Sequence, residues 1–480
     1  MKLKLSIVMT MTLINLNLQA YDKELTRFIN DTVEQKMVDY AALKKENVIQ
    51  KEQLQEFKER VEELEETIEL VETKTLVDKI DFSLGFTTTV NSYDKKYADS
   101  HTHQSNNLYS TKLMLNMDAK IADNMKFSGK LSMYKYWADS TMHMYSQYDN
   151  MQGRVPGDSG LFVERAFVDW KITDNDSPIP SILTIGRQPS SDGPSHQFKA
   201  NTTRKATYSA LVFDGASDGI VLTSSLKNIS PLKNSNLRFG YGKGYQNDQT
   251  KLSSNAFIGS DNALKDTDVY GLFFESLILN KPNTLFQVGV ASMQNIIANA
   301  LEPNEETNKN IGDVTFLGTM VEGTNINNSG FDLFAHFAYS QAKPSHDAYT
   351  YNNMQFSLLS NGDDFSDKSA TAFWLGGRYT FDNNSKIGLE YNQGSKYWLT
   401  ASQGSFDLLN KLATRGKAYE AYYIHPINRY SFLRLGGTYV DYDYTNSGWF
   451  VGEPMKLSTS NSSESMNSIK NIYLQFGLNY

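Results

Sequence analysis

Hydrophobic and polar residues alternate without a break over the last nine residues of the chain. The apolar face consists of Ile472, Leu474, Phe476, Leu478 and Tyr480. A strand with this pattern can end a soluble sheet, but an apolar face completed by a carboxy-terminal aromatic residue is typical of outer-membrane barrels, where that face meets lipid. We interpret the segment as the closing strand of such a barrel. Phe476, Leu478 and Tyr480 are then the expected recognition signal for the barrel-assembly machinery.

The same two-residue period recurs in sixteen segments from Ile80 onward, most of them near the about 9–11 residues that cross a bilayer at a tilt. The segments lie near residues 80–92, 108–122, 124–137, 161–173, 181–188, 216–226, 236–246, 267–279, 284–295, 313–325, 330–341, 370–381, 385–398, 417–426, 429–443 and 468–480. Short connections alternate with long ones, as periplasmic turns and extracellular loops do in membrane barrels. We therefore predict an all-β transmembrane barrel of about 16 antiparallel strands over residues 79–480. An even number of strands places both ends of the barrel on the periplasmic side, with the last strand beside Ile80–Val90.

The first twenty residues have a different pattern. Lys2 and Lys4 precede an uncharged, mostly apolar run over residues 5–18, and Gln19 and Ala20 follow it. This order is that of a secretory signal peptide, so residues 1–20 are expected to be removed after Ala20. The alternative is an uncleaved amphipathic helix.

Apolar residues recur with spacings of three and four within residues 21–78. The clean part of this repeat consists of Leu54, Phe57, Val61, Leu64, Ile68 and Val71, and mostly charged residues lie between them. The pattern predicts a coiled coil that precedes the barrel in the periplasm. A single long helix would show the same spacing, but it would leave the apolar stripe in water, which favours a homo-oligomer. Such a helix could also extend towards the cell wall.

Composition agrees with this architecture and excludes several classes of function. The 28 Tyr, 26 Phe and 5 Trp residues suit the aromatic girdles of a barrel. The net charge of −8 argues against a nucleic-acid partner, which requires a basic face. The absence of cysteine excludes thiolate metal sites, and we find no zinc or phosphate-binding motif, so we expect no metal or other cofactor.

A barrel of sixteen strands should enclose a water-filled channel. Alternation predicts which charged side chains face it: Lys112, Asp118, Lys126, Lys130, Arg165, Asp169, Lys171, Arg187, Arg378, Glu390, Glu420 and Arg434. These residues could simply solvate the wall and pair with one another, or they could set up a transverse field that favours one sign of ion. The four arginines are the candidates for attracting anions.

The third long connection, residues 189–215, is rich in turn-forming residues at both ends. In general porins the third extracellular loop folds into the pore and sets its width. We weigh this placement against an ordinary surface loop.

Three segments resemble motifs of a known family: Glu164–Trp170, Gly186–Pro189 and Phe213–Gly219. The family comprises outer-membrane proteins of campylobacterial bacteria and is catalogued as a domain of unknown function. The resemblance implies a porin-like barrel with a signal peptide and an acidic coiled coil, and it supplies no substrate. More distantly, the layout is similar to trimeric 16-stranded porins with an N-terminal coiled coil, which implies a trimer.

The function expected from these features is passive diffusion of ions and small polar solutes through an outer-membrane porin of a Gram-negative bacterium. Pore width and inward charge would select the solutes. One alternative is a structural or adhesion protein that links the cell wall and the surface. Another is a hydrolase at the barrel rim, but the sequence has no nucleophile motif, so we do not expect an enzyme.

Overall fold

The computed structural model describes residues 32–42, 44–45, 51, 55–65, 80–137, 161–189, 192–215, 217–246, 264–298, 309–346, 349–351, 354–402, 407–459 and 465–480. The chain divides into two units, Met1–Lys79 and Ile80–Tyr480. Among the described residues, no helix is long and apolar enough to cross a membrane.

The described residues of the first unit, 32–42, 44–45, 51 and 55–65, are helical. Phe57 and Leu64 of the predicted apolar stripe are largely exposed on this helix, at 67% and 59%. Leu54, Ile68, Val71 and the predicted signal peptide lie outside the described residues. The coiled coil therefore stays a prediction, carried by an apolar stripe that the helix alone does not cover.

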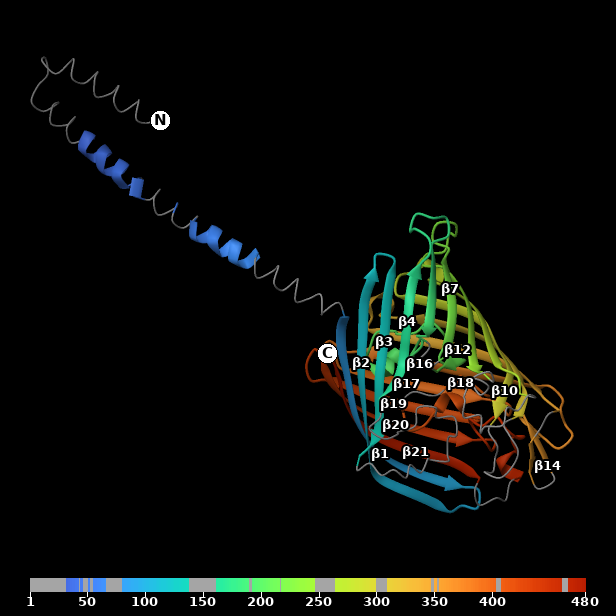
Figure 1. The fold of residues 1–480 in the computed structure, drawn as a ribbon. Helices are drawn as coiled ribbons and strands as arrows, with labels where there is room; N and C mark the ends of the chain where they lie inside the picture. The colour runs from blue at the N-terminus through green and yellow to red at the C-terminus, as the bar shows by residue number, and fades with distance from the viewer. Residues whose placement is uncertain are drawn as a thin grey trace, which may run out of the picture. The chain divides into compact units, whose positions relative to one another are not determined.

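The second unit is a closed antiparallel barrel of sixteen strands (Figure 1). The strands are β1 (Ile80–Tyr97), β2 (Thr102–Ala122), β3 (Met125–Tyr136), β4 (Phe162–Lys171), β5 (Ser181–Arg187), β7 (Asp218–Ser225), β8 (Asn236–Tyr245), β9 (Thr267–Ser276), β10 (Thr284–Ala298), β11 (Lys309–Gly323), β12 (Phe331–Pro344), β16 (Lys368–Thr380), β17 (Lys386–Gly394), β19 (Gly416–Pro426), β20 (Ser431–Tyr442) and β21 (Met466–Asn479). Each of the sixteen predicted segments overlaps one of these strands, so the predicted barrel is confirmed.

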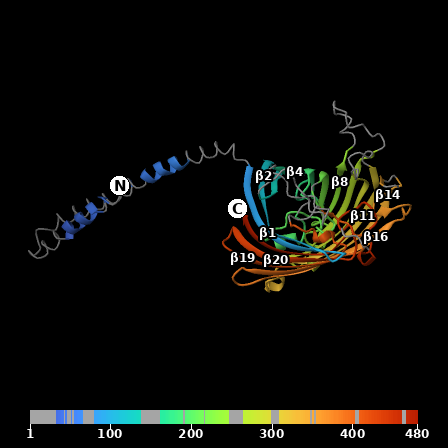
Figure 2. The same ribbon diagram turned by 90° about the horizontal axis from the view of Figure 1, so that it is seen from below.

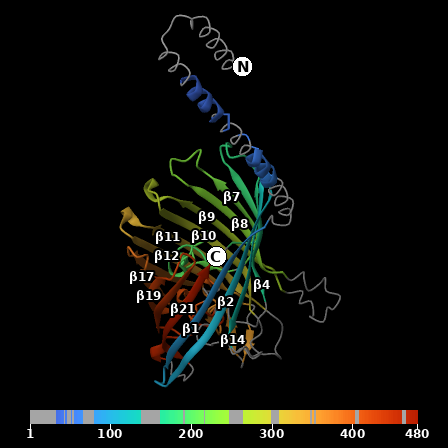
Figure 3. The ribbon, with the colours of Figure 1, turned by 90° about the vertical axis from the view of Figure 1, so that its left-hand side faces the viewer.

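The barrel closes where the last strand meets the first (Figure 3). β21 runs antiparallel to β1, with Leu478 opposite Phe86 and Leu474 opposite Val90. Tyr480 exchanges two backbone hydrogen bonds with Leu84, at 2.7 and 2.8 Å, so pairing reaches the last residue of the chain. Because closure leaves no free edge, the backbone groups of the wall are satisfied within the sheet, as a bilayer requires.

Alternation gives the wall an apolar outer face. Exposed large apolar residues occupy alternate positions on strands all around the barrel, among them Phe239, Leu272, Leu317, Leu333, Leu389 and Leu435. On β21, Ile472 is 64% exposed, whereas its neighbours Asn471 and Tyr473 are buried on the inner side. This outer face matches the surface that lipid contacts in a membrane barrel.

Most of the turns at one end are short, and they contain η1 (Ile278–Asn280) and η2 (Ile326–Asn328). The connections at the other end include β13 (Tyr349–Tyr351), β14 (Met354–Ser357) and β15 (Ser360–Asn361), which form a small sheet, and η4 (Leu457–Thr459). The β1–β2 connection, residues 98–101, is shorter than expected because both strands extend beyond their predicted ends.

Two connections fold inward instead of outward (Figure 2). The β5–β7 connection contains α3 (His196–Ala200) and β6 (Phe213–Asp214), and the β17–β19 connection contains β18 (Ala401–Ser402) and η3 (Lys411–Ala413). β6 and β18 pair in parallel, which joins the two connections. We call their described residues, 192–215, 395–402 and 407–415, the plug. Of the two placements weighed for the third long connection, the structure shows inward folding for residues 192–215.

The apolar core of the barrel lies between the plug and one side of the wall. Phe198, Val212 and Trp398 of the plug belong to one buried cluster with Phe334 and Trp374 of β12 and β16. The rings of Phe198 and Phe334 stack with their centroids 5.8 Å apart. The plug is therefore packed as the interior of a globular domain is packed, and it is not a loosely held loop.

We expect the two faces of β21 to respond differently to charge. Ile472→Arg, near the middle of the strand, should lower the free energy of unfolding in lipid vesicles by about 2–4 kcal/mol, because the outer face there meets hydrocarbon. Gln475→Arg, on the inner face, should change it by only about 0.5 kcal/mol. Urea unfolding followed by tryptophan fluorescence measures both, and equal losses would contradict the assignment of faces.

Candidate functional site

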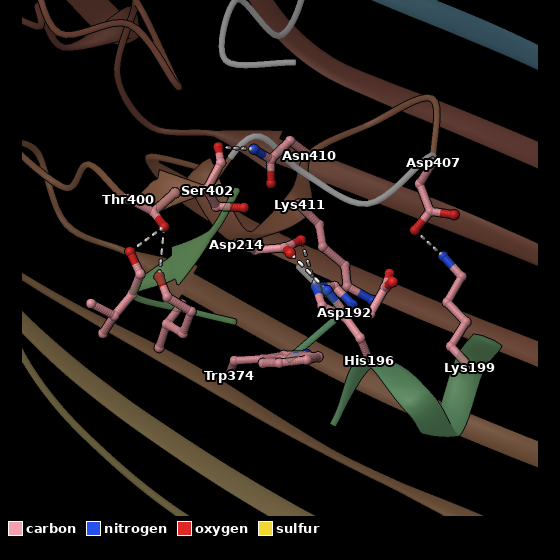
Figure 4. A network of polar contacts seen from close by, with 12 residues as sticks. Asp192, His196, Lys199, Asp214, Trp374, Thr400, Ser402, Asp407, Asn410 and Lys411 are labelled. Atoms are coloured by element: carbon pink, nitrogen blue, oxygen red, sulfur yellow. Dashed lines mark hydrogen bonds and ion pairs between the residues drawn. The ribbon is translucent and has the colours of Figure 1, made fainter. Parts of the chain in front are cut away.

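A network of buried ion pairs holds the plug against the wall, and Figure 4 shows one further pair of this network, between Lys199 and Asp407. Lys411 of the plug contacts Glu390 of β17 at 2.5 Å and also contacts Glu420 of β19. Lys199 of α3 contacts Glu420 at 2.5 Å and Asp407 at 2.6 Å. The two lysines and the two glutamates are buried, and Asp407 is partly exposed. Alternation predicts that both glutamates line the pore, and in the structure their carboxylates face the interior but are covered by the plug.

Charges in such a place are stable only when they are paired. Trp374 adds a hydrogen bond of 3.0 Å from its indole nitrogen to Glu390. Burial alone would raise the pKa of Asp407, but the nearby Lys199, Arg434 and Lys411 outweigh this effect and hold that pKa well below its usual range. Asp407 therefore stays ionised at mildly acidic pH, and the plug keeps this contact.

Two of the predicted arginines hold α3 by its backbone. Arg378 forms an ion pair of 2.6 Å with Asp332 and donates a hydrogen bond of 2.8 Å to the carbonyl of Phe198. Arg434 donates to the carbonyl of Lys199. The last carbonyls of a helix have no partner within the helix, so guanidinium groups from β16 and β20 supply one here. These arginines position the plug.

Hydrogen bonds also join the two halves of the plug. Thr400 donates from its hydroxyl to the carbonyl of Leu211 at 2.7 Å (Figure 4). The backbone N–H of Ala401 donates to the carbonyl of Val212 at 3.0 Å. Arg415 is fully buried and donates to the carbonyls of Trp398 at 2.9 Å and Asn446 at 2.7 Å. Burial lowers the pKa of Arg415 to about 9.

A serine of the plug and a histidine of the wall meet where the plug contacts β12. Ser195 Oγ lies 2.9 Å from His336 Nε2 and donates to Glu322 at 2.8 Å, and Ser209 occupies the other ring nitrogen of His336 at 2.7 Å. A hydrolytic triad needs an accessible serine and a carboxylate on that second nitrogen. Here Ser195 is completely buried and His336 is 2% exposed. This cluster therefore fastens the plug and does not have the geometry of a hydrolase.

A cavity of about 400 Å³ remains on the side of the barrel away from the buried core. Its wall side is formed by residues of β1–β4, β20 and β21, and its other side by the plug from Asp192 to Lys205 with Asp407. Hydroxyl and amide groups, such as those of Thr87, Asn116 and Gln475, contribute to the lining. The lining therefore combines charged and polar groups with apolar side chains such as those of Leu84 and Phe432.

Four of the predicted pore-lining residues border this cavity: Lys112, Lys130, Arg165 and Arg434. Arg378, Glu390 and Glu420 face inward but lie under the plug, in the contacts described above. Asp118 pairs with Lys126 at 2.7 Å, and Asp169 accepts a hydrogen bond of 2.5 Å from Thr184. Lys171 is exposed at the end of β4.

Arg187 has a different position from the predicted one. It forms an ion pair of 2.8 Å with Asp218, which lies opposite it on β7. The preceding cross-strand pair on this face is Ile185 and Ile220, and both are exposed on the outside of the wall. The register thus places Arg187 on the outer face, near the rim of the barrel.

Sequence reasoning missed the charged residues of the plug, namely Asp192, Lys199, Lys205, Asp407 and Lys411. These residues lie in connections between strands. Side chains there do not alternate between the two faces of a sheet, so the sequence pattern does not assign them to the interior. Among the residues that the structure describes, no three His, Cys, Asp or Glu side chains lie together in a way that could hold a metal ion.

Solved structures with a similar fold are outer-membrane proteins. The high-pH structure of Pseudomonas putida OprB is 12% identical, covers 85% of this chain and 96% of its own, and has a TM-score of 0.50. The anion-selective porin from Comamonas acidovorans is 12% identical, with coverages of 84% and 99% and a TM-score of 0.45. The trimer form of OmpT from Vibrio cholerae is 11% identical, with coverages of 83% and 99% and a TM-score of 0.41.

No curated protein matches the sequence. Residues 102–480 match the model of the family described as "Protein of unknown function (DUF3373)". The chain therefore belongs to this family. The match agrees with the expected family of unknown function, while a campylobacterial origin stays an expectation.

The buried ion pairs should matter far more than exposed ones. Lys411→Met leaves Glu390 buried with only a hydrogen bond from Trp374, so it should lower the free energy of unfolding by about 3–5 kcal/mol. Lys396→Met is the matched control, because Lys396 pairs with Glu453 at 2.7 Å where both side chains are partly exposed. Its loss should be below about 1 kcal/mol. Denaturant unfolding of both variants is the measurement, and similar losses would refute the anchoring role of Lys411.

Proposed function

We propose that this member of the family is an outer-membrane porin that lets ions and small polar solutes diffuse passively. The observation that carries the proposal is the combination of a closed, outwardly apolar sixteen-stranded wall with a charged interior cavity of about 400 Å³. The plug occupies one side of the interior and leaves this cavity beside the other, so it would act as the constriction. Width and inward charge would then select solutes.

The same proposal includes the cellular setting. A signal peptide over residues 1–20 would direct export, and Phe476, Leu478 and Tyr480 would be recognised by the barrel-assembly machinery. Pairing of Tyr480 with Leu84 supports this role, since the last residue belongs to the closing seam. The coiled coil over residues 21–78 would lie in the periplasm, contact the cell wall and join the chains of a homo-oligomer, a trimer by analogy.

Purified protein should form stable open channels in planar lipid bilayers, with a conductance that rises with salt concentration. A passive, water-filled path requires both properties. Circular dichroism must show β-structure in the sample applied. Folded protein that is reproducibly silent would refute the porin proposal.

A plug variant serves as the matched comparison for this measurement. Replacing Gly193–Ser209 by a short Gly-Ser linker removes α3 from the interior and should raise the single-channel conductance. If this variant does not fold, Lys386→Met provides a milder test, because Lys386 binds Asn201 at the end of α3. The milder variant should show more frequent changes of conductance level than the wild type. Unchanged channels would contradict the constriction role of the plug.

The coiled coil should contribute to assembly. Deletion of Tyr21–Thr75 behind an intact signal peptide should reduce the oligomer mass in mild detergent, because the apolar stripe that buries itself between helices is lost. Light scattering measures this mass. An unchanged mass would show that the barrel walls alone hold the subunits together.

A further inference from the structure

The wall of the barrel carries inward carboxylates that do not face the cavity. Glu390 and Glu420 are covered by Lys411 and Lys199 of the plug, and Asp332 is paired with Arg378. None of these three carboxylates borders the cavity. Docking of the plug therefore removes acidic groups from the part of the interior that solutes can reach.

The remaining lining is mainly cationic. Among the described residues, the cations that border the cavity are Lys112, Lys130, Arg165, Lys199, Lys205 and Arg434. The carboxylates that border it are Asp192 and Asp407. Glu164 and Glu420 contact Lys130 and Lys199 on the side away from the cavity. When they are included, six cationic side chains face four acidic side chains and the terminal carboxylate of Tyr480.

These cations surround the cavity. Lys112, Lys130 and Arg165 come from β2, β3 and β4, whereas Lys199 and Lys205 come from the plug and Arg434 comes from β20. The electrostatic potentials of like charges on facing sides add up within the cavity, whereas opposite charges would produce an electric field across it. Walls of low dielectric constant focus such a potential into the cavity.

Two of the lining cations contribute to the potential in the cavity in different ways. Lys205 is exposed, so its ammonium group is hydrated and can interact with ions that enter the cavity. Arg434 is buried, and its Nε has no hydrogen-bond partner in the described structure. An anion in the cavity would interact favourably with both groups, and a cation would be repelled.

We propose that the cavity beside the plug favours small anions over cations, with Lys112, Arg165, Lys205 and Arg434 supplying the positive potential. The inference rests on the proposed porin function, and it names the class of solute. Alternation along the strands allows an electric field across the channel, between charges of opposite sign on its two sides. The cavity instead has a mainly cationic lining, because the plug pairs with acidic residues of the wall.

The reversal potential of single channels across a potassium chloride gradient tests the inference. Wild-type channels should prefer chloride. Lys205→Glu should lower the chloride-to-potassium permeability ratio by about fivefold, because a unit charge at close range shifts the energy of an ion by about RT even in water. Lys227→Glu, in the exposed turn after β7 and outside the cavity, is the matched control and should leave the ratio unchanged.

The outcomes separate this inference from the porin proposal. Open channels that prefer potassium, or equal effects of Lys205→Glu and Lys227→Glu, would overturn the anion inference and leave the porin proposal intact. A folded but silent wild-type protein would overturn both. If Lys205→Glu fails to fold, Lys205→Gln removes one charge without adding another and should shift the ratio in the same direction by a smaller factor.

Discussion

The pairing of wall carboxylates with plug lysines is the interaction on which the rest of the interior depends. Glu390 and Glu420 point into the barrel from β17 and β19, and the plug covers them with Lys411 and Lys199. Removing either partner would leave a buried charge uncompensated, which is far more costly than the pair itself. The plug therefore has one favourable position, and the space that it leaves open is a fixed property of the fold.

The closed wall makes this arrangement possible. Because every strand has two neighbours, the backbone needs no help from the plug, and lipid can contact the outer face all around. The inner face can therefore carry charged side chains. Arg378 and Arg434 on this face donate hydrogen bonds to the last carbonyls of α3. A five-residue helix with little stability of its own thus keeps a defined position.

Alternation was sufficient to predict the wall, because sixteen strands repeat one simple rule and the face of Ile472 is strictly apolar. Of the residues that it assigns to the pore lining, Lys112 and Arg434 border the cavity, whereas Glu390 pairs with Lys411 of the plug. Alternation could not predict the plug, since β6 and β18 are two residues long and their pairing joins positions far apart in the chain. It misplaced Arg187 because the outer face near the rim meets water, where a charged residue does not indicate the interior.

The sign of the charge in the cavity shows why composition alone is a poor guide to a channel. The chain is acidic, with a net charge of −8, yet the cavity lining is cationic. What matters is which charges are neutralised by folding. Lys199 and Lys411 of the plug pair with wall glutamates, so the plug removes acidic groups from the path. A barrel of the same composition with the plug turned outward would expose Glu390 and Glu420 to the channel. Loop placement, through the carboxylates that it covers, is therefore the determinant of the interior potential in this fold.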